Sequence, residues 1–362
     1  MTLHSKMIFG LLFLFSSALT GVVESAPTSA MEDRLSHSFS HFPKHANTTP
    51  EYPIHQHGQV IQEKQLHARS PWSIPNVINR FVQASDPGPN NVVNFVPPFI
   101  TYSTINNDFS CKGYDQVFGE FLQIKAKGIK GVRVYGVDCN SYWTVQPAAR
   151  ALGLKIMQGF WITQAGTWSI NQAVTDLVNW IKYYNGNNWD LIDSIIVGNE
   201  AVTAGWIDAH QLLGKIRDVR GQLRQAGYVG PISTAEIPSV YMQNPFLCVG
   251  DDTIDFVGVN AHPYFDSGKR YDQAGEFMQS QIDVVSQACQ GKAVKIVETG
   301  YPSGGNVHGN QAPSPHGQAV AITQIYNVLK GDVVMFTMYD DYWKSPGPFN
   351  IEQKFGMFWL LP

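Results

Sequence analysis

Two glutamates are the residues whose type and position best fit catalytic chemistry. Glu200 ends the short apolar run Ser194-Ile-Ile-Val-Gly-Asn-Glu200, and Glu298 ends the run Val294-Lys-Ile-Val-Glu298. Both runs have the composition of buried parallel strands, so each glutamate is expected at a carboxyl strand end, where α/β barrels hold their chemistry. Two carboxyl groups that face one substrate are what glycoside hydrolysis requires. The pair is therefore predicted to act on a glycosidic bond.

The elements that must position this pair follow from the periodicity of residues 98–362. Short apolar runs alternate with segments of helical periodicity, such as residues 113–127 and 170–183, which predicts a parallel sheet with crossover helices. The predicted strands are residues 99–102, 131–135, 155–160, 192–198, 232–235, 255–260, 295–298 and 333–338. This pattern predicts an α/β fold, a (β/α)8 TIM barrel, whose usual length is about 250 residues. An open doubly wound sheet is the alternative, but no glycine-rich phosphate turn follows the first run.

The first 97 residues have a different composition. Lys6 precedes an apolar stretch over residues 7–19, so residues 1–25 are predicted to be a secretory signal peptide that is cleaved after Ser25. Residues 26–97 are rich in Ser, His, Pro and Gln and are predicted to be a flexible extension. The sequon at Asn47 is a candidate glycosylation site. We expect a secreted, extracellular protein without a membrane span.

Four cysteines are an even set in an exported chain and predict two disulfides, for which three pairings are possible. Sequence alone cannot choose among the pairings. We favour Cys111 with Cys139, because both follow the first two predicted strands, and Cys248 with Cys289, because both precede the sixth and seventh. No cysteine or histidine spacing is typical of zinc, and His262 is expected to pack in or line the cleft, so neither metal nor cofactor is predicted.

Charge and aromatic content narrow the class of partner. The formal net charge is -4 and the signs are interspersed, which predicts neither a nucleic-acid partner nor an anionic membrane partner. The chain has 9 Trp, 15 Tyr and 20 Phe, and aromatic rings in loops can stack on sugar faces. A neutral partner is therefore expected, and the protein is predicted to be a monomer.

Several motifs carry a resemblance to a known family. They are Val197-Gly-Asn-Glu-Ala-Val202, Gly258-Val-Asn-Ala-His-Pro-Tyr264, Val297-Glu-Thr-Gly-Tyr-Pro-Ser303, Val132-Arg-Val-Tyr135 and Phe355-Gly-Met-Phe358. In this order and at these strand ends they resemble glycoside hydrolase family 17, especially its fungal members that modify cell-wall glucan. The resemblance covers essentially all of residues 99–360.

The resemblance implies a retaining enzyme that acts on β-1,3-glucan, with Glu200 as general acid/base and Glu298 as nucleophile. The pKa of Glu200 must then lie above its usual value, and the charge of Glu298 would help to raise it. Asn199 matches the family residue that contacts the sugar 2-hydroxyl. Tyr264 matches a family tyrosine that orients the nucleophile by a hydrogen bond.

Further substrate contacts are predicted at the strand ends. Asp341 and Lys344 match an acid and lysine pair of the family, although this chain has Asp where the family usually has Glu. Glu236, after the fifth strand, is either a substrate ligand or part of a loop salt bridge. The aromatic residues expected to stack on glucose rings are Tyr102, Tyr135, Tyr301, Tyr339 and Trp343.

These observations predict an endo-1,3-β-glucanase type of enzyme in the cell wall, with β-1,3-glucan as its partner. The alternative is a glucan transglycosylase, which lengthens or branches chains with the same catalytic pair. A remote alternative is a non-catalytic wall protein that binds glucan. That alternative predicts the loss of a catalytic glutamate, and both Glu200 and Glu298 are present.

Overall fold

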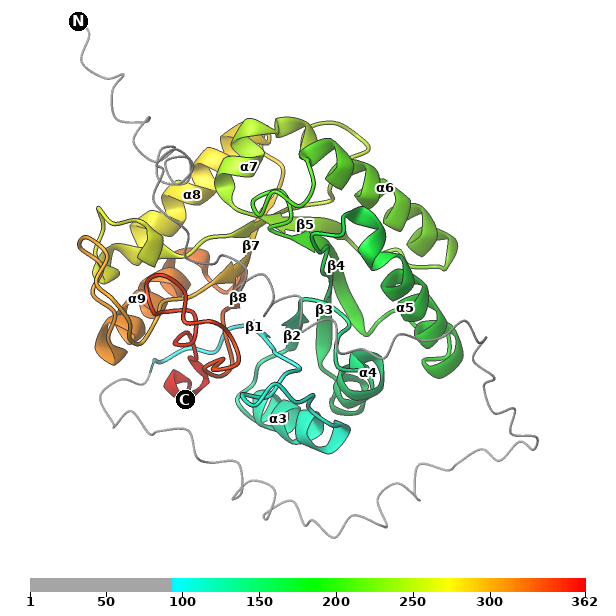
Figure 1. Cartoon of the computed structure of the whole chain (residues 1–362), viewed down its shortest axis with the longest axis horizontal. Helices are drawn as coiled ribbons and strands as arrows, with labels where there is room; N and C mark the ends of the chain where they lie inside the picture. The colour runs from blue at the N-terminus through cyan, green and yellow to red at the C-terminus, as the bar shows by residue number, and fades with distance from the viewer. Residues whose placement is uncertain (1–92) are drawn as a thin grey trace, which may run out of the picture. The chain divides into compact units, whose positions relative to one another are not determined.

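The structure, a computed structural model, describes residues 93–362. Eight parallel strands close into a barrel in the order β1-β2-β3-β4-β5-β6-β7-β8, and β1 pairs with β8. Helices surround the barrel, as Figure 1 shows. The predicted (β/α)8 fold is therefore confirmed. Because every strand pair is parallel, all the carboxyl strand ends open at one end of the barrel.

The strands are β1 (Phe99–Thr101), β2 (Gly131–Val134), β3 (Lys155–Phe160), β4 (Ile192–Asn199), β5 (Ile232–Glu236), β6 (Val257–Asn260), β7 (Val294–Thr299) and β8 (Val333–Met335). The α-helices are α3 (Tyr114–Ala126), α4 (Ser141–Leu152), α5 (Asn171–Tyr184), α6 (Ala209–Gln225), α7 (Pro238–Gln243), α8 (Ala274–Ala288) and α9 (Pro315–Leu329). Short 3₁₀ helices are η2 (Thr167–Ile170), η3 (Pro245–Leu247), η4 (Pro263–Phe265), η5 (Tyr271–Gln273) and η6 (Phe358–Leu360).

All eight predicted strands are present, and four of them are shorter than predicted. The first and second strands each end one residue early. The sixth strand begins at Val257 rather than at residue 255, although the backbone N–H of Asp255 donates to the carbonyl of Ile232 at 2.9 Å and its carboxylate accepts from the N–H of Ile232 at 2.7 Å. The eighth strand ends at Met335 rather than at residue 338. Beyond it, backbone hydrogen bonds continue irregularly, for example from Met338 to β1.

The core has two parts. A small apolar cluster fills the barrel, and its buried members are Met157, Ile196, Ala235, Phe256, Val297 and Val334. A larger cluster lies between the strands and the surrounding helices. There α3 buries Val117, Phe121 and Ile124, which are the apolar positions whose spacing predicts a helix in this segment.

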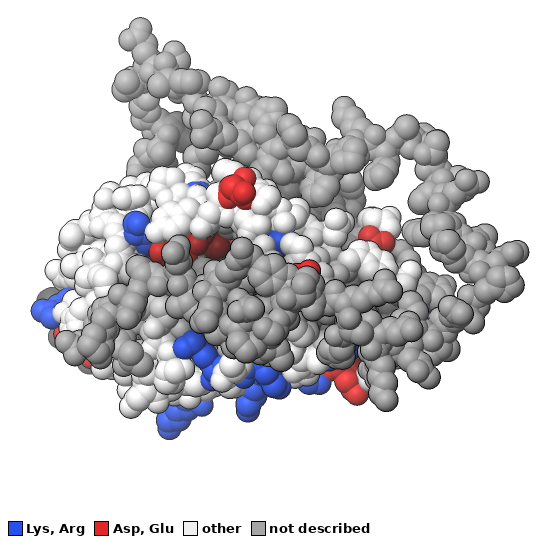
Figure 2. All heavy atoms as spheres, turned by 90° about the horizontal axis from the view of Figure 1, so that it is seen from below, with Lys and Arg blue, Asp and Glu red and all other residues white. Residues whose placement is uncertain are grey.

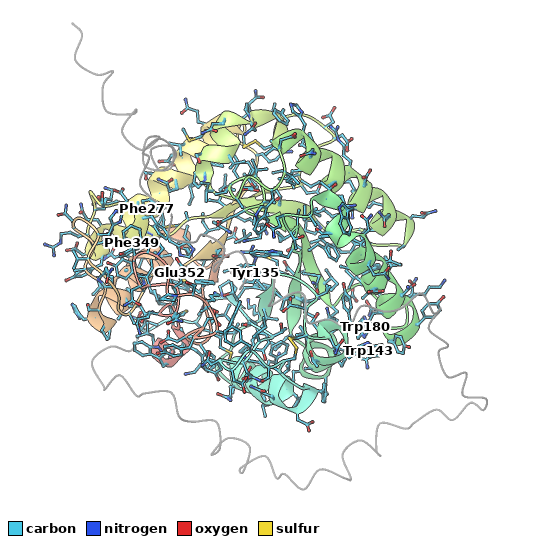
Figure 3. The ribbon with its side chains drawn as sticks, viewed as in Figure 1. Tyr135, Trp143, Trp180, Phe277, Phe349 and Glu352 are labelled. Carbon is cyan, nitrogen blue, oxygen red and sulfur yellow. A yellow bond between two sulfur atoms is a disulfide. The ribbon has the colours of Figure 1, made fainter. Side chains whose placement is uncertain are left out.

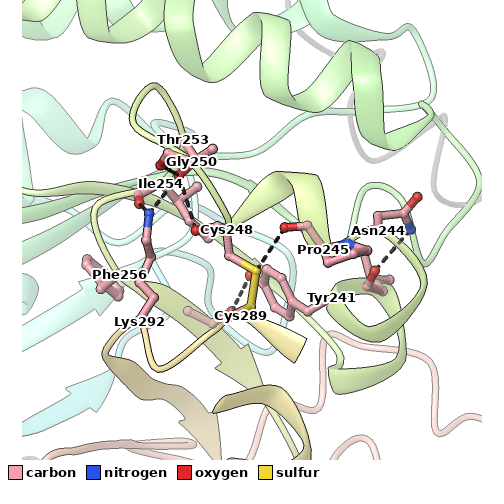
Figure 4. Close-up of a disulfide and its surroundings, with 12 residues drawn as sticks. Tyr241, Asn244, Pro245, Cys248, Gly250, Thr253, Ile254, Phe256, Cys289 and Lys292 are labelled. Carbon is pink, nitrogen blue, oxygen red and sulfur yellow. Dashed lines mark hydrogen bonds between the residues drawn. A yellow bond between two sulfur atoms is a disulfide. The ribbon is translucent and has the colours of Figure 1, made fainter. Parts of the chain in front are cut away.

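Both predicted disulfides are confirmed. Cys111 pairs with Cys139, and Cys248 pairs with Cys289, across sequence separations of 28 and 41 residues. Figure 4 shows the second bridge, which links the chain after η3 to the end of α8. Tyr241 lies beside it and donates from its hydroxyl to the backbone of Gly258 on β6 at 2.7 Å. This bridge therefore joins two connections on the outside of the sheet.

The described chain packs from its first residue. The backbone N–H of Val93 donates to the carbonyl of Leu360 at 2.9 Å, and the ring of Phe95 stacks on Tyr326 of α9 at 3.8 Å between centroids. The predicted signal peptide, most of the predicted extension and Asn47 lie outside the described residues. Within residues 93–362, none of the helices is long and apolar enough to cross a membrane.

Candidate active site

Glu200 directly follows Asn199, the last residue of β4. Its backbone is left-handed, with φ of 53°, a conformation that costs a residue with a side chain about 1 kcal/mol. Gly198 also has a positive φ, of 77°. The N–H of Glu200 donates to the carbonyl of Ala235 on β5 at 2.8 Å, and its carboxyl Oε1 accepts from Asn260 Nδ2 at 2.8 Å. The strand therefore ends in a turn that holds Glu200 at the barrel opening.

Glu298 lies within β7 and is only 8 % exposed. Its Oε2 accepts hydrogen bonds from the Tyr135 hydroxyl at 2.5 Å and from Arg133 Nη1 at 3.2 Å. Its Oε1 lies 3.2 Å from Nε2 of His262. Figure 3 shows Tyr135 at the centre of the barrel. Three donors, two from β2 and its end and one from beyond the end of β6, therefore face one buried carboxylate.

Arg133 connects most of these groups. It lies in β2 and is 1 % exposed. Its Nη2 donates to Asn199 Oδ1 at 2.6 Å, and its Nη1 donates to the carbonyl of Val297 at 2.7 Å. Its guanidinium also lies over the ring of Tyr135, at 4.6 Å from the centroid. One buried cation thus fixes the side chains of β2 and β4 against β7.

Asn260, the last residue of β6, links the two carboxyl groups. Its Nδ2 donates to Glu200 Oε1 and, at 3.0 Å, to Asn199 Oδ1, while its Oδ1 accepts from Arg133 at 3.3 Å. Because Arg133 also contacts Glu298, a continuous chain of hydrogen bonds runs from one glutamate to the other. The structure therefore brings Asn199 and Glu200, at the end of β4, together with Glu298 of β7, although β5 and β6 lie between these two strands.

The two glutamates have opposite pKa shifts. Burial raises the pKa of Glu200, and the nearby charge of Glu298 raises it further. Burial also opposes the ionisation of Glu298, but the hydrogen bond from His262, the charge of Arg133 and the hydrogen bond from Tyr135 together lower its pKa to about 2. At mildly acidic pH, Glu298 is therefore ionised while Glu200 retains a proton more readily than a free glutamate does.

His262 follows β6 and packs against Phe265, Phe336 and Phe355. Burial lowers its pKa, but its hydrogen bond and charge interaction with Glu298 outweigh burial and raise it. Its Nδ1 is buried and has no hydrogen-bond partner among the described residues. Among the described residues, the imidazole therefore forms its side-chain hydrogen bond with Glu298, through Nε2. The expectation of a packed histidine was correct, and its contact with the nucleophile candidate was missed.

Three predicted sugar-stacking or orienting tyrosines are buried. Tyr102, Tyr264 and Tyr301 are each at most 2 % exposed, so their rings present no face to a sugar in this structure. Tyr102 donates to Glu120 at 2.5 Å, and Tyr301 donates to Gln311 at 2.8 Å. Their role in this structure is packing, because each ring lies in the core and each hydroxyl has a protein acceptor.

The Tyr264 hydroxyl forms no hydrogen bond with Glu298 among the described residues. Its hydroxyl donates to the backbone carbonyl of Asn306 at 2.8 Å, and the tyrosine hydroxyl that reaches Glu298 is that of Tyr135. The hydrogen bond to Glu298 that was predicted for Tyr264 is therefore made by Tyr135. The reason is that Tyr264 lies in η4, past the end of β6, whereas Tyr135 directly follows β2.

Glu236, predicted to be a substrate ligand or part of a loop salt bridge, is neither. It is the last residue of β5, has no exposed surface, and its carboxyl accepts hydrogen bonds from the chain that follows Glu200. Burial raises its pKa to about 7. No ion pair to it occurs in the described part of the chain.

The remaining predicted contacts lie after β8. Asp341 and Lys344 form an ion pair at 2.8 Å, and the indole of Trp343 donates to Asp341 at 3.1 Å. The ammonium of Lys344 lies over Phe336, 4.5 Å from the centroid. Trp343 and Tyr339 are half-buried, so these two aromatic residues, like Tyr135, keep part of their surface open.

A row of aromatic rings leads away from Tyr135 and was not predicted. Trp161, which follows β3, lies 6.2 Å from Tyr135 between centroids, and Trp206, in the loop between β4 and α6, lies 5.9 Å from Trp161. Both tryptophans are half-buried. The row therefore starts at a residue bonded to Glu298 and ends in the loop that follows Glu200.

Arg133 and Asn260 were also missed as site residues, although the sequence carries a signal for each. Arg133 is a charged residue inside the apolar strand Gly131–Val134, and such a residue is seldom buried without partners. Asn260 ends β6 as Asn199 ends β4. Side-chain direction, which decides whether they meet the glutamates, is not readable from a single sequence.

Two carboxyl groups at the open end of a (β/α)8 barrel, one ionised and one with a raised pKa, define a glycoside hydrolase type of site. Comparison with protein families agrees. Residues 100–356 match the family model described as the BtgE/BtgC glycoside hydrolase domain. The chain belongs to this family, and its fold and motifs place it with glycoside hydrolase family 17. Among the described residues, no group of three or more His, Cys, Asp or Glu side chains is placed to hold a metal ion.

Curated relatives match the barrel. "Probable beta-glucosidase btgE" of Aspergillus fumigatus is 36 % identical over 259 residues, which are 72 % of this chain and 44 % of that protein. "Cell surface mannoprotein MP65" of Candida albicans is 34 % identical over 260 residues, 72 % of this chain and 66 % of that protein. The chain thus spans less than half the length of the btgE relatives that it matches.

A solved structure shares both fold and moderate identity. The family 17 β-1,3-glucanosyltransferase of Rhizomucor miehei is 26 % identical, with a TM-score of 0.57, and covers 72 % of this chain and 92 % of that chain. Its active-site mutant in complex with laminaritriose is 25 % identical, with a TM-score of 0.58 and the same coverage. A plant β-glucan endohydrolase, at 16 % identity and a TM-score of 0.53, shares the fold.

Proposed function

We propose that this chain is a retaining glycosidase of the endo-1,3-β-glucanase type, with Glu298 as nucleophile and Glu200 as general acid/base. One observation carries the proposal: the two carboxyl groups share one hydrogen-bonded network and have opposite pKa shifts. Retention requires such a division, because one group must be an anion while the other holds a proton. The names of the relatives support glucan as the substrate class.

In the first step, the Glu298 carboxylate attacks the anomeric carbon of the glucan chain. The bond from that carbon to the glycosidic oxygen breaks, and Glu200 gives its proton to the departing oxygen. The product is a glucosyl ester on Glu298. Either Glu298 oxygen carries at least one donor in the free enzyme, so the nucleophile begins the reaction already oriented.

In the second step, the Glu200 carboxylate removes a proton from the incoming acceptor. Because esterified Glu298 has no charge, the repulsion that raises the pKa of Glu200 disappears, and Glu200 now favours the ionised state. The acceptor oxygen attacks the anomeric carbon, and the ester bond breaks. Glu298 leaves as a carboxylate, and two inversions give net retention.

Asn199 fits a role in binding the sugar 2-hydroxyl. Its Oδ1 accepts from both Arg133 and Asn260, which fixes the orientation of the amide and leaves its NH₂ group to donate to substrate. A hydrogen bond to the 2-hydroxyl strengthens as the oxocarbenium-like transition state forms. Asn199 directly precedes Glu200, so both residues are placed to contact the same sugar linkage.

A second candidate function is transfer of the glucosyl group to another glucan, and the aromatic row favours it. Trp206 lies in the loop that follows Glu200, the proposed acid/base, and its ring is 5.9 Å from that of Trp161 between centroids. Half-buried indole faces can hold a sugar there and exclude water from the ester. The Rhizomucor miehei neighbour is a glucanosyltransferase by its title. The catalytic pair is the same for both outcomes.

The proposal is tested by incubating the protein with a defined β-1,3-gluco-oligosaccharide and analysing the products by mass, linkage and initial anomeric form. We expect β-anomers at first release, as retention requires. Products longer than the substrate identify transfer, and shorter products alone identify hydrolysis. Glu298→Gln should lower turnover by at least about a thousandfold while the far-UV circular dichroism stays unchanged. A variant that kept most of its activity would exclude Glu298 as nucleophile.

A further inference from the structure

The turn that follows Glu200 is an irregular segment between β4 and α6. Glu200 itself is left-handed, and its carbonyl accepts from the N–H of Ala204 at 2.8 Å. The N–H of Trp206 donates to the carbonyl of Ala201 at 3.1 Å, which closes a second turn. A left-handed residue that carries a side chain persists only where its surroundings fix it. Contacts from outside the turn must therefore stabilise it.

The carboxyl group of Glu236 accepts hydrogen bonds from this turn. Its Oε1 accepts from the backbone N–H of Val202 at 2.8 Å. Its Oε2 accepts from the backbone N–H of Thr203 at 3.2 Å and from the Thr203 hydroxyl at 2.8 Å. The preceding residue, Ala235, accepts from the N–H of Glu200. Two successive residues at the end of β5 thus hold the backbone at positions 200, 202 and 203.

We infer that Glu236 is a positioning residue for Glu200: its buried carboxyl group holds the turn that carries the general acid/base in its left-handed conformation. This inference rests on the proposed function, in which Glu200 is the acid/base. A direct role in substrate binding is excluded by burial, because Glu236 has no exposed surface and both of its oxygens are occupied by the turn.

The contacts of Glu236 with Val202 and Thr203, here called the clamp, require a carboxyl group. Each of the two oxygens faces a backbone N–H, so each must offer a lone pair. A carboxylate does so at both positions. A protonated carboxyl also does so, because its hydroxyl can donate to Thr203 Oγ1 while its oxygen still accepts. A glutamine places an NH₂ group, which cannot accept, against one of the two N–H groups. Glu236→Gln should therefore open one side of the clamp.

The test compares two substrates that differ in their need for an acid. Laminari-oligosaccharides have a poor leaving group, whereas 2,4-dinitrophenyl β-laminaribioside releases a phenolate that needs no proton. For both, kcat/KM reports the steps up to ester formation. We expect Glu236→Gln to lower kcat/KM for the oligosaccharide by about tenfold to a hundredfold and for the aryl glycoside by less than about threefold.

Two further variants keep the test decisive. Thr203→Val removes only the hydroxyl group that donates to Glu236. It should lower kcat/KM for the oligosaccharide by about two- to fivefold and leave that for the aryl glycoside nearly unchanged. This variant tests the inference even if Glu236→Gln does not fold. Asp255→Asn is the matched control, because Asp255 accepts from the backbone N–H of Ile232 at the opposite end of β5. It should leave the ratio of the two kcat/KM values unchanged.

The two possible failures are distinguishable through Glu200→Ala. One outcome is that Glu200→Ala lowers kcat/KM much more for the oligosaccharide than for the aryl glycoside, while Glu236→Gln and Thr203→Val lower both kcat/KM values equally. The positioning role of Glu236 is then overturned and the proposed function stands. If Glu200→Ala also lowers kcat/KM equally for the two substrates, Glu200 is not the general acid, and both the proposed function and the inference are overturned.

Discussion

Glu298 shows how a buried carboxyl group can remain an anion. Burial alone would favour its neutral form, but hydrogen bonds from His262 and Tyr135 and the charge of Arg133 outweigh that effect. Neutralising the group would leave these buried donors without an anionic acceptor. The nucleophile candidate is therefore kept ready by residues from β2 and from the end of β6, rather than by its own strand.

The hydroxyl of Tyr135 is expected to help keep Glu298 ionised. It donates to Glu298 Oε2 at 2.5 Å and lowers the pKa of that carboxyl group. In Tyr135→Phe the pKa of Glu298 should rise. Because the nucleophile must be ionised, the acid limb of the kcat/KM pH profile should move to higher pH. We expect kcat/KM at mildly acidic pH to fall by about tenfold, and a profile unchanged in shape and position would contradict the proposed arrangement.

Residue positions were easier to predict than side-chain partners. Glu200 and Glu298 could be placed because an apolar run with a terminal acid indicates a strand end, and the barrel then brings the strand ends together. Tyr264 and Glu236 could not be assigned correctly, because one sequence does not tell whether a side chain points into the barrel opening or into the core. Arg133 was overlooked for the same reason.

At the scale of elements, alternating strands and helices fixed the topology, whereas the strand ends near the site are irregular. The register shifts between β4 and β5, and again between β6 and β7 where Asn260 lies opposite Glu298. Such irregularities re-aim side chains at the edge of a sheet. They depend on contacts such as that of Glu200 with Ala235, which are distant in sequence, so local patterns do not predict them.

The bridge between Cys248 and Cys289 should stabilise the connections that flank β6 and β7. It closes a loop with a sequence separation of 41 residues, for which the chain-entropy model gives about 4 kcal/mol. Cys248→Ala with Cys289→Ala should therefore lower the free energy of unfolding by about 2 to 4 kcal/mol, measured by urea denaturation. The Cys111 and Cys139 pair, with 28 residues of separation, is the matched comparison and should lose slightly less. Equal stability of both double variants and the parent would contradict the prediction.

At the scale of the whole molecule, the barrel contains every residue to which the proposed chemistry assigns a role. On the face in Figure 2, several Lys and Arg side chains lie along the lower edge, Asp and Glu side chains lie above them, and most of the other visible atoms of the described residues are uncharged. The visible part of this face is consistent with a neutral polymer as partner. The hydrogen bonds that join Glu200 and Glu298 all come from residues of the barrel, so turnover is expected not to depend on the first 92 residues.

Two truncated chains test whether residues 26–92 contribute to turnover. Val93 and Phe95 are 4 % and 7 % exposed and pack against the C-terminal segment and α9, so the packed domain includes them. A chain that begins at Val93 should keep kcat/KM for laminari-oligosaccharides within about twofold of a chain that begins at Ala26, because the site network lies wholly in the barrel. A chain that begins at Phe99 should lose about 3 kcal/mol of unfolding free energy in urea, since two apolar side chains leave the core. If the Val93 chain instead folds with the same stability but turns over much more slowly, residues 26–92 act in catalysis or substrate capture, and the barrel alone does not account for the activity.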